Sequence, residues 1–357
     1  MRSRSKGERA FVRGLVVCLL LLGLGFGLWQ KDRRDDALVV YCAHDRQFAE
    51  PILDEFASRM GVSLIVQYDT ESTKSLGLVK RILLEAGDPQ CDVLWNNEAS
   101  GTILLRSAGL LEPYRGKGYQ RAPPHARDPD GFWVGFGGRM RVVIYNTERT
   151  KFDEAMAREV FPPGDLSRVA IAKPLYGTTF THYAALWHHL GAEQLKRRHR
   201  DAVSRGLKIV PGNATVKDLV ARGACDWGWT DTDDAFVAKD AGYPVAMEPV
   251  RLPDGKTLCI PNTVCIIRGT RKREAAEALV DFLASAEVEA KLAQSAARQI
   301  PLGPVDESRL PPDVRRLKAW AEESADVASL AESYGPCLKW LNAEFGLPAP
   351  ELSAGAH

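Results

Sequence analysis

Short apolar segments alternate with amphipathic helical segments along most of this chain, and that alternation constrains the fold more than any other feature of the sequence. The apolar stretch 38–42 predicts a buried strand. After it Phe48, Ile52, Phe56 and Met60 recur every four residues, the spacing of a helix that packs one face on a sheet. Strands separated by helices in this way are typical of α/β domains with mostly parallel sheets.

The same pattern continues in two units, and a length of 357 residues suits two lobes of ordinary size. Further strands are predicted at 62–68, 92–95, 141–146, 169–172, 207–210 and 226–230. The polar stretch 112–130, rich in Gly and Pro, is predicted to be a surface excursion, and a strand at 262–269 could rejoin either sheet. Because no flexible linker separates the units, we expect lobes that share crossover strands, with a cleft between them.

The first thirty residues have the composition of an export signal. Five basic residues and one acidic residue give them a net charge of +4, and an uncharged, largely apolar run extends from Gly14 to Gln30. This run is longer than a typical secretory core and shorter than a typical membrane-spanning helix. We therefore expect an exported body, either cleaved from this leader or tethered by it; a buried N-terminal helix of a cytosolic protein is the alternative.

The charge of the chain argues against one class of partner. Its 47 basic and 46 acidic side chains nearly cancel, and without the first thirty residues 42 basic and 45 acidic groups remain, a net of −3. No excess of positive charge is left for a nucleic-acid surface, so DNA or RNA binding is not expected.

Six cysteines remain after the leader, and export would permit them to form disulfides. They are Cys42, Cys91, Cys225, Cys259, Cys265 and Cys337. The number is too small for a disulfide scaffold, and the absence of a CxxC pair makes structural zinc unexpected. We expect small buried thiols on strands.

Polar side chains follow several predicted strands, at the sheet edge where open α/β domains bind ligands. His44 follows the first strand, Glu98 the third, and Asp231 and Asp233 the strand 226–230. Imidazole and carboxylates suit a hard or borderline cation. Plainer alternatives are a structural histidine, a glutamate that caps its own helix, and a hydrated acidic turn.

Two other loops carry a different chemistry. The turns at 177–179 (GTT) and 212–215 (GNAT) offer hydroxyls, an amide and backbone N–H groups at predicted helix starts. Such groups suit an anion such as phosphate or carbonate, although the threonines could simply be N-caps. On the helix after the first turn lie His182, His188 and His189, where we expect solvated side chains rather than a metal pair.

Signatures of enzymes are missing from the sequence. It contains no GxSxG, P-loop, HExxH or strand-following GxGxxG motif. The glycine-rich segment 135–139 precedes a strand rather than opening a helix, and no serine nucleophile with a matched base is visible. A binding protein rather than an enzyme is therefore expected.

From about Leu38 to Leu302 the chain resembles the periplasmic solute-binding proteins of ABC transporters, specifically the ferric-ion-binding family. The segments that carry the resemblance are VVYCAHDRQFAEPILDEF, CDVLWNNE, GGRMRVVIYNT, KPLYGTTFTHYAALW, GNATVKDLVARGACDWGWTDTDDA and IPNTVCIIRG. It implies a periplasmic-binding-protein-like α/β fold, in which two doubly wound lobes joined by crossover strands enclose a ligand cleft. It also implies iron(III) as the ligand, with a synergistic anion.

The resemblance further implies where the protein works and with what. An ABC transporter permease in the inner membrane would be the partner of a monomeric binding protein. The location would be the periplasm or the extracytoplasmic face of the membrane.

Residue by residue, the resemblance adds to the metal ligands expected from the strand ends. His44 and Glu98 match ligand positions of the first lobe, and Tyr145 matches a tyrosine ligand of some branches. Where many members have two adjacent tyrosines, this chain has the sequence TDTDD, which leaves Asp231 and Asp233 as the expected ligands. Carboxylates are weaker iron(III) ligands than phenolates.

The resemblance also names residues for the anion. Thr178, Thr179 and Asn213 match anion-contacting positions, and Arg139 and Arg141 lie in the segment that supplies a basic group in some members. Two other functions stay open on the same fold. One is a binding protein for a small phosphorylated or carboxylate solute without iron, and the other is a membrane-tethered sensor or enzyme.

The expected organisation has five parts. They are a leader at 1–36, a first lobe at 37–138, a second lobe at 139–247, a return to the first lobe at 248–298, and C-terminal helices at 299–350 that pack on the lobes.

Overall fold

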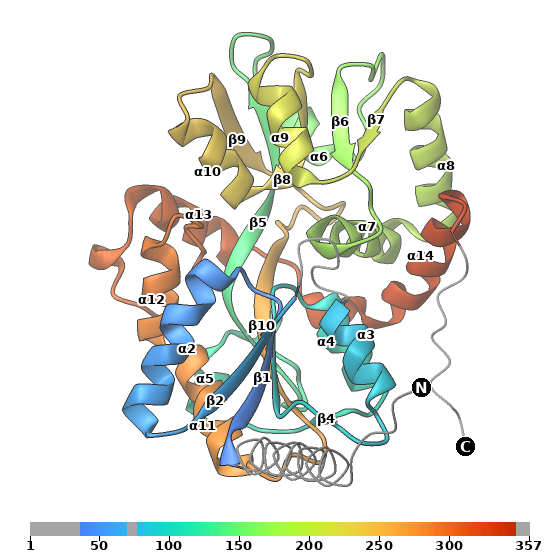
Figure 1. Cartoon of the computed structure of the whole chain (residues 1–357). Helices are drawn as coiled ribbons and strands as arrows, with labels where there is room; N and C mark the ends of the chain where they lie inside the picture. Colours follow the sequence, from blue (N-terminus) through green and yellow to red (C-terminus); the bar gives the residue numbers. More distant parts are fainter. Residues whose placement is uncertain (1–35, 70–76, 348–357) are drawn as a thin grey trace, which may run out of the picture.

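The computed structural model describes residues 36–69 and 77–347, which form two α/β lobes on one continuous sheet (Figure 1). The strands are β1 (Leu38–Cys42), β2 (Leu64–Tyr68), β3 (Val93–Asn96), β4 (Leu111–Glu112), β5 (Val134–Asn146), β6 (Val169–Ala172), β7 (Lys208–Val210), β8 (Trp227–Asp231), β9 (Val245–Pro249) and β10 (Cys259–Ile267). They are ordered β2-β1-β3-β10-β5-β8-β6-β7, with β4 beside β10 and β9 beside β5.

Helices cover both faces of this sheet. They are α2 (Arg46–Met60), α3 (Gly77–Leu84), α4 (Ser100–Ser107), α5 (Lys117–Arg121), α6 (Glu154–Arg158), α7 (Gly177–Leu190), α8 (Ala192–Ser204), α9 (Asn213–Ala221), α10 (Thr232–Asp240), α11 (Arg273–Leu283), α12 (Ala286–Gln294), α13 (Pro312–Glu322) and α14 (Ala331–Glu344). Within the described residues, three short 3-10 helices lie at Pro124–Ala126, Glu307–Arg309 and Val327–Leu330. The first of these and α5 lie in the predicted surface excursion at 112–130.

The first lobe is wound on both faces of its part of the sheet. Strand β1 is parallel to β2 and β3, and its side chains alternate between two cores. Leu38 and Val40 pack towards α2 and α11, whereas Val39 and Tyr41 pack towards α3 and α4, because successive side chains of a strand point to opposite faces. Strand β10 returns antiparallel to β3, so the strand predicted at 262–269 joins the first lobe.

The second lobe is built around β6, β7 and β8, which are parallel to one another. Helices α9 and α10 cover one face through a core that includes Val216, Val220 and Phe236. On the other face, α7 and α8 pack into a core with Trp227 and Trp229. Helix α8 follows α7 after Gly191 and is not among the elements expected from the sequence, because many of its residues are charged and only Leu195, His199 and Ala202 are buried.

Strand β5 joins the lobes. Its first half pairs with β10 and its second half with β8 and β9, so the predicted lobe boundary at residue 139 falls inside this strand. It begins at Val134, seven residues earlier than expected, because the glycine-rich segment is part of the strand. A side chain at Gly135 would meet the carbonyl oxygen of Ala126 at 2.5 Å, and Gly137 has a φ of 50° beside a bulge in the pairing. Glycine here permits the close strand contact and the bend.

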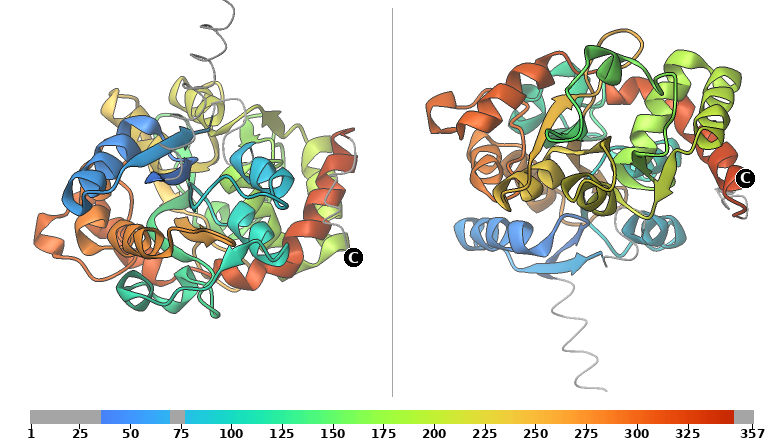
Figure 2. Two further views of the ribbon diagram at one scale, coloured as in Figure 1. Left: turned by 60° about the horizontal axis from the view of Figure 1, so that its bottom comes forward. Right: turned by 90° about the horizontal axis from the view of Figure 1, so that it is seen from above.

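The C-terminal helices pack on both lobes. Helix α13 packs through Leu317 and Ala321 on the second-lobe core below β9, and α14 packs against α7 of the second lobe and α4 of the first. Seen from above, α12 and α13 lie at one edge of the molecule and α14 at the opposite edge (Figure 2). These helices therefore brace the two lobes from opposite sides.

The expected leader, with Cys18, lies outside the described residues except for Asp36. Within the described ranges, no helix has both the length and the apolar character needed to cross a membrane. The six other cysteines are all buried and free of disulfides, which confirms the expectation of buried thiols. Only Cys42, Cys259 and Cys265 lie on strands.

We predict that the contact between α14 and α7 contributes strongly to stability. The ring of Trp340 lies 5.8 Å from that of Trp187 and 5.6 Å from that of His199, and the side chain is 8% exposed. Trp340→Ala should lower the free energy of unfolding by about 3–5 kcal/mol, measured by denaturant titration. Lys339→Ala, at the exposed neighbouring position, should change it by less than about 0.5 kcal/mol; equal effects of the two changes would contradict the prediction.

Candidate functional site

A buried ion pair stands where the crossover strand meets the second lobe. Arg141 on β5 and Asp231 at the end of β8 are direct cross-strand partners, and Nη1 of Arg141 donates to Oδ1 of Asp231 at 2.7 Å. The arginine side chain is 0% exposed and the aspartate side chain 6%. Because an isolated charge is very costly to bury, each of these groups depends on the other.

Donors from two helix N-termini complete the surroundings of Asp231. Thr178 in the first turn of α7 donates to Oδ2 of Asp231 at 2.5 Å, and Nδ2 of Asn213, the first residue of α9, donates to the same oxygen at 2.9 Å. The Oδ1 atom of Asn213 accepts from Thr179 at 3.1 Å and from Arg141 at 3.3 Å. The structure thus brings four of the predicted anion residues together, around a carboxylate that was expected to bind a metal.

Three carboxylates lie together at the start of α10. Asp231, Asp233 and Asp234 each offer an oxygen, and these atoms lie within 4.8 Å of one another. Burial raises the pKa of Asp233. The positive charge of Arg139 lowers this pKa, and the negative charge of Asp231 raises it. Burial and the charges of Asp233 and Asp231 raise the pKa of Asp234 to about 8. Asp234 was not among the predicted ligands, although the TDTDD sequence contains it.

Arg139 connects this acidic cluster to the first lobe. Its Nε lies 3.7 Å from Oδ2 of Asp233, and its Nη1 donates to the backbone oxygen of Asn97 at 3.3 Å. When the Gln299 amide is turned so that its oxygen faces Arg139, Nη2 of Arg139 donates to that oxygen at 3.2 Å. The amide of Gln299 also lies 3.4 Å from Nε2 of His44. His44 and Asp233 are therefore joined through two intervening side chains rather than by direct contact.

His44 is held between aromatic rings of the first lobe. It is buried, and its ring lies 5.2 Å from that of Trp95 and 6.0 Å from that of Phe48. The packing fixes the imidazole at the carboxyl end of β1, where its Nε2 faces the Gln299 amide.

Glu98 acts as a helix cap in this structure. Its carboxylate accepts from the backbone N–H and hydroxyl of Ser100, both at 2.7 Å, and from the N–H of Gly101 at 3.0 Å, at the positive end of α4. Thr181 on α7 of the second lobe also donates to it, at 3.1 Å. The plainer alternative from the sequence thus describes its contacts, and Glu98 does not belong to the hydrogen-bonded group around Asp231.

The structure does not bring Tyr145 together with the other predicted ligands. It lies on β5 four residues beyond Arg141, which is about 13 Å along a strand. Its ring lies 5.6 Å from that of Phe152, and it lines a pocket of about 220 Å³ between α10, β9 and α13. The register of β5 therefore places this phenol at a different part of the second lobe.

His182 is buried beside the ion pair, not solvated as the sequence led us to expect. It is 0% exposed, and its ring lies 4.6 Å from that of Trp229. Burial and the charge of Arg141 lower the pKa of His182 well below its ordinary value, so the ring is neutral. Among the described residues, neither nitrogen of His182 has a hydrogen-bond partner, and neither do Nε and Nη2 of Arg141. By contrast, His188 is exposed.

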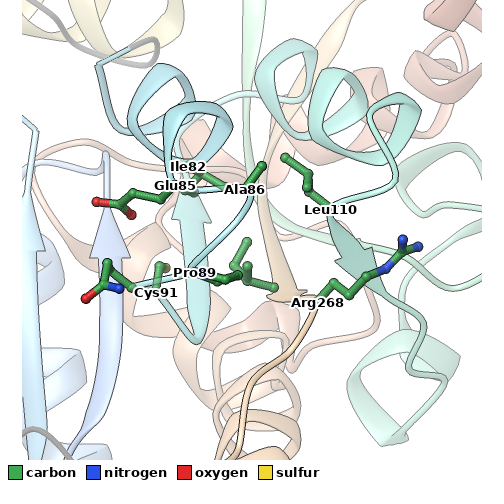
Figure 3. A pocket seen from close by; sticks show the side chains of 9 residues that line it. Ile82, Glu85, Ala86, Pro89, Cys91, Leu110 and Arg268 are labelled. Carbon is green, nitrogen blue, oxygen red and sulfur yellow. The ribbon is translucent and has the colours of Figure 1, made fainter. Parts of the chain in front are cut away.

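A separate small pocket lies at the other end of the first lobe. It measures about 60 Å³ and is lined by Ile82 of α3, Glu85, Cys91, Leu110 and Arg268, among others (Figure 3). Cys91 precedes β3 whereas Glu98 follows it, so this pocket and Glu98 are at opposite ends of the strand. None of the predicted site residues lines it.

Two α/β lobes joined by crossover strands, with polar groups gathered where the lobes meet, define a two-lobed solute-binding protein. Residues 38–295 match the family model described as bacterial extracellular solute-binding protein. The chain belongs to this family. The predicted fold class is confirmed.

The chain is also similar to named bacterial proteins. Over 226 residues the chain is 26% identical to iron uptake protein A2 of Synechocystis, a match that covers 58% of this chain and 64% of that protein, slightly less than two thirds. It is 25% identical to the major ferric iron-binding protein of Neisseria meningitidis, over 75% of this chain and 81% of that one. The crystal structure of iron-bound HitA from Pseudomonas aeruginosa superposes with a TM-score of 0.69 at 20% identity, over 87% and 99% of the two chains.

The raised pKa of Asp234 predicts a pH-dependent effect of its removal. An unfolded aspartate releases its proton near pH 4, whereas folded Asp234 keeps its proton up to about pH 8. Between these pH values the folded state binds more protons than the unfolded state, so this group makes the protein less stable as the pH rises.

In metal-free protein, Asp234→Asn should therefore be more stable than the wild type at pH 8 to 9. The gain should be limited to roughly 1–2 kcal/mol, because water screens the charges of a partly exposed cluster. The gain should vanish near pH 4. Thermal melts across this range provide the measurement, with Asp54→Asn on the exposed face of α2 as the control. A gain that is independent of pH would count against the assignment.

Proposed function

We propose that this protein captures iron(III), or a ferric complex, outside the cytoplasm and delivers it to an ABC-type importer. The observation that carries the proposal is the cluster of three carboxylates at the start of α10, beside the junction of the lobes. Iron(III) is a hard cation, and carboxylate oxygens are suitable ligands for it. The names of the relatives, iron uptake protein and ferric iron-binding protein, point in the same direction.

The described contacts suggest a division of roles within the site. Asp233 and Asp234 are the proposed cation ligands, because burial and the charges of neighbouring carboxylates raise both pKa values, and a cation would relieve that repulsion. Asp231 would contribute from the ion-paired side of the cluster. His44 is a candidate ligand from the first lobe, since Gln299 and Arg139 connect it to Asp233.

The proposed working motion is the opening and closing of the lobes, with no covalent step. The chain would act as a monomer at an inner-membrane permease. It would be located in the periplasm or be tethered to the membrane by its leader. A binding protein rather than an enzyme is proposed, in agreement with a family of solute-binding proteins.

One alternative has an observation in its favour. Arg141 and Thr178, which are buried, and the half-buried Asn213 form a set of donors that would suit a phosphorylated or carboxylate solute without iron. In this structure all three donate to Asp231. The alternative therefore requires that Asp231 leave them, which makes it the weaker proposal.

Ligand titrations separate the two functions. Ferric citrate should raise the melting temperature of the metal-free protein, and citrate alone, phosphate and sugar phosphates should not. Asp233→Ala and Asp234→Ala should each weaken ferric binding by tenfold or more, because each removes one oxygen ligand. The matched control, Asp54→Ala, should bind as the wild type does. Stabilisation by a phosphate ester without iron would overturn the proposal.

The position of Tyr145 makes a spectroscopic prediction. Iron(III) bound by a phenolate has a strong visible charge-transfer band, whereas carboxylate and imidazole ligands give no such band. The ferric protein should therefore lack the phenolate band, and Tyr145→Phe should leave ferric affinity unchanged. A visible band that disappears in Tyr145→Phe would show instead that this tyrosine reaches the metal.

A further inference from the structure

The hydrogen bonds around Asp231 are those of a small anion site. A guanidinium, a hydroxyl and an amide converge on its two carboxylate oxygens, from Arg141 at 2.7 Å, Thr178 at 2.5 Å and Asn213 at 2.9 Å. Thr178 and Asn213 stand at the starts of α7 and α9, where free N–H groups and the helix dipole favour negative charge. Independent chain segments have thus built a buried oxyanion site, and its occupant is a side chain of the protein.

The Asp231 side chain binds the donors of this site instead of capping the helix that it precedes. Asp231 occupies the N-cap position of α10, yet its side chain makes no capping hydrogen bond to that helix. An aspartate at this position would ordinarily accept from the first free backbone N–H groups. Its carboxylate points instead to the donors of β5, α7 and α9.

The site has more donors than Asp231 satisfies. Arg141 is fully buried, and its Nε and Nη2 atoms have no hydrogen-bond partner among the described residues. Charge-assisted bonds from a guanidinium to an oxyanion are commonly bidentate, whereas the hydrogen bond to Asp231 uses Nη1 alone. A free oxyanion is not tethered to the backbone. It could therefore accept hydrogen bonds from more of the guanidinium nitrogens than the Asp231 carboxylate does.

We propose that Asp231 is a built-in anion, which fills a subsite that would otherwise hold a small free carboxylate or phosphate. The wild-type protein then needs no free anion at this position. Removal of the carboxylate should create a site for acetate, formate or phosphate. A second consequence rests on the proposed function: from the anion subsite, the Asp231 carboxylate also faces Asp233 and Asp234, so ferric binding should be independent of added anions.

Two substitutions of the full-length chain test the subsite without any metal. Asp231→Ala removes the charge and leaves space, whereas Asp231→Asn removes the charge but fills the space. In chloride buffer both should melt below the wild type, because Arg141 loses its counter-charge. Acetate, formate or phosphate should raise the melting temperature of Asp231→Ala by about 2–4 °C or more. Asp231→Asn, the wild type and Asp54→Ala should respond no more than they do to chloride at equal ionic strength.

Each result decides the question. An equal response of the wild type and Asp231→Ala, an equal response of Asp231→Ala and Asp231→Asn, or no response of Asp231→Ala to any oxyanion would overturn the built-in anion. If Asp231→Ala does not fold in chloride, its refolding yield is measured with and without acetate and phosphate. Recovery only with an oxyanion supports the proposal, and no recovery contradicts it. A larger response to acetate or to phosphate shows whether the subsite prefers a carboxylate or a phosphate.

Failure of the proposed iron function would not affect these titrations, since they contain no metal. The ferric consequence has its own measurement. Wild-type affinity for iron, supplied as ferric nitrilotriacetate, should change less than twofold on addition of phosphate or carbonate. The affinity of Asp231→Ala for iron should depend on the presence of phosphate or carbonate.

Discussion

The buried pair of Arg141 and Asp231 is the interaction on which the rest of the site depends. A guanidinium that is 0% exposed is stable only beside a negative charge, and removal of one member of such a pair costs about 3–5 kcal/mol. The cross-strand register of β5 and β8 places the two residues opposite each other. The same carboxylate draws in the first turns of α7 and α9, so one ion pair organises four elements of the second lobe.

The long crossover strand connects that pair to the first lobe. Two residues before Arg141, on the same strand, Arg139 reaches Asn97 and Gln299 on one side and Asp233 on the other. Cross-lobe contacts of this kind are individually worth about 0.5–1.5 kcal/mol. They are weak enough to be exchanged for contacts with a ligand, as a protein that binds and releases a solute requires. The strongly stabilised ion pair and the exchangeable bridge thus stand next to each other on β5.

Sequence reasoning was correct about positions that follow from a place on a strand or at a helix start. The strand ends correctly brought Asp231, Thr178 and Asn213 to one site, because parallel strands present their carboxyl ends at the same edge. Sequence reasoning was less informative where the contacts of a side chain depend on residues far away in the sequence. Glu98 stands where a ligand was expected, yet the N–H groups of α4 and the hydroxyl of Thr181 use its oxygens. His182 was expected in solvent and is buried, because α7 is covered on several sides.

By itself the sequence determined the two α/β lobes, the crossover between them, the buried cysteines and the loops that carry polar groups. These follow from local periodicity and from the chemistry of short segments. Only the tertiary structure decided which polar group meets which. The donors expected to hold a free anion hold Asp231, Asp234 joins the acidic cluster, and Tyr145 lies about 13 Å along β5 from the ion pair. The physical reason is that hydrogen bonds and ion pairs are short-ranged, so their partners are fixed by strand register and by the packing of helix ends, which no single segment specifies.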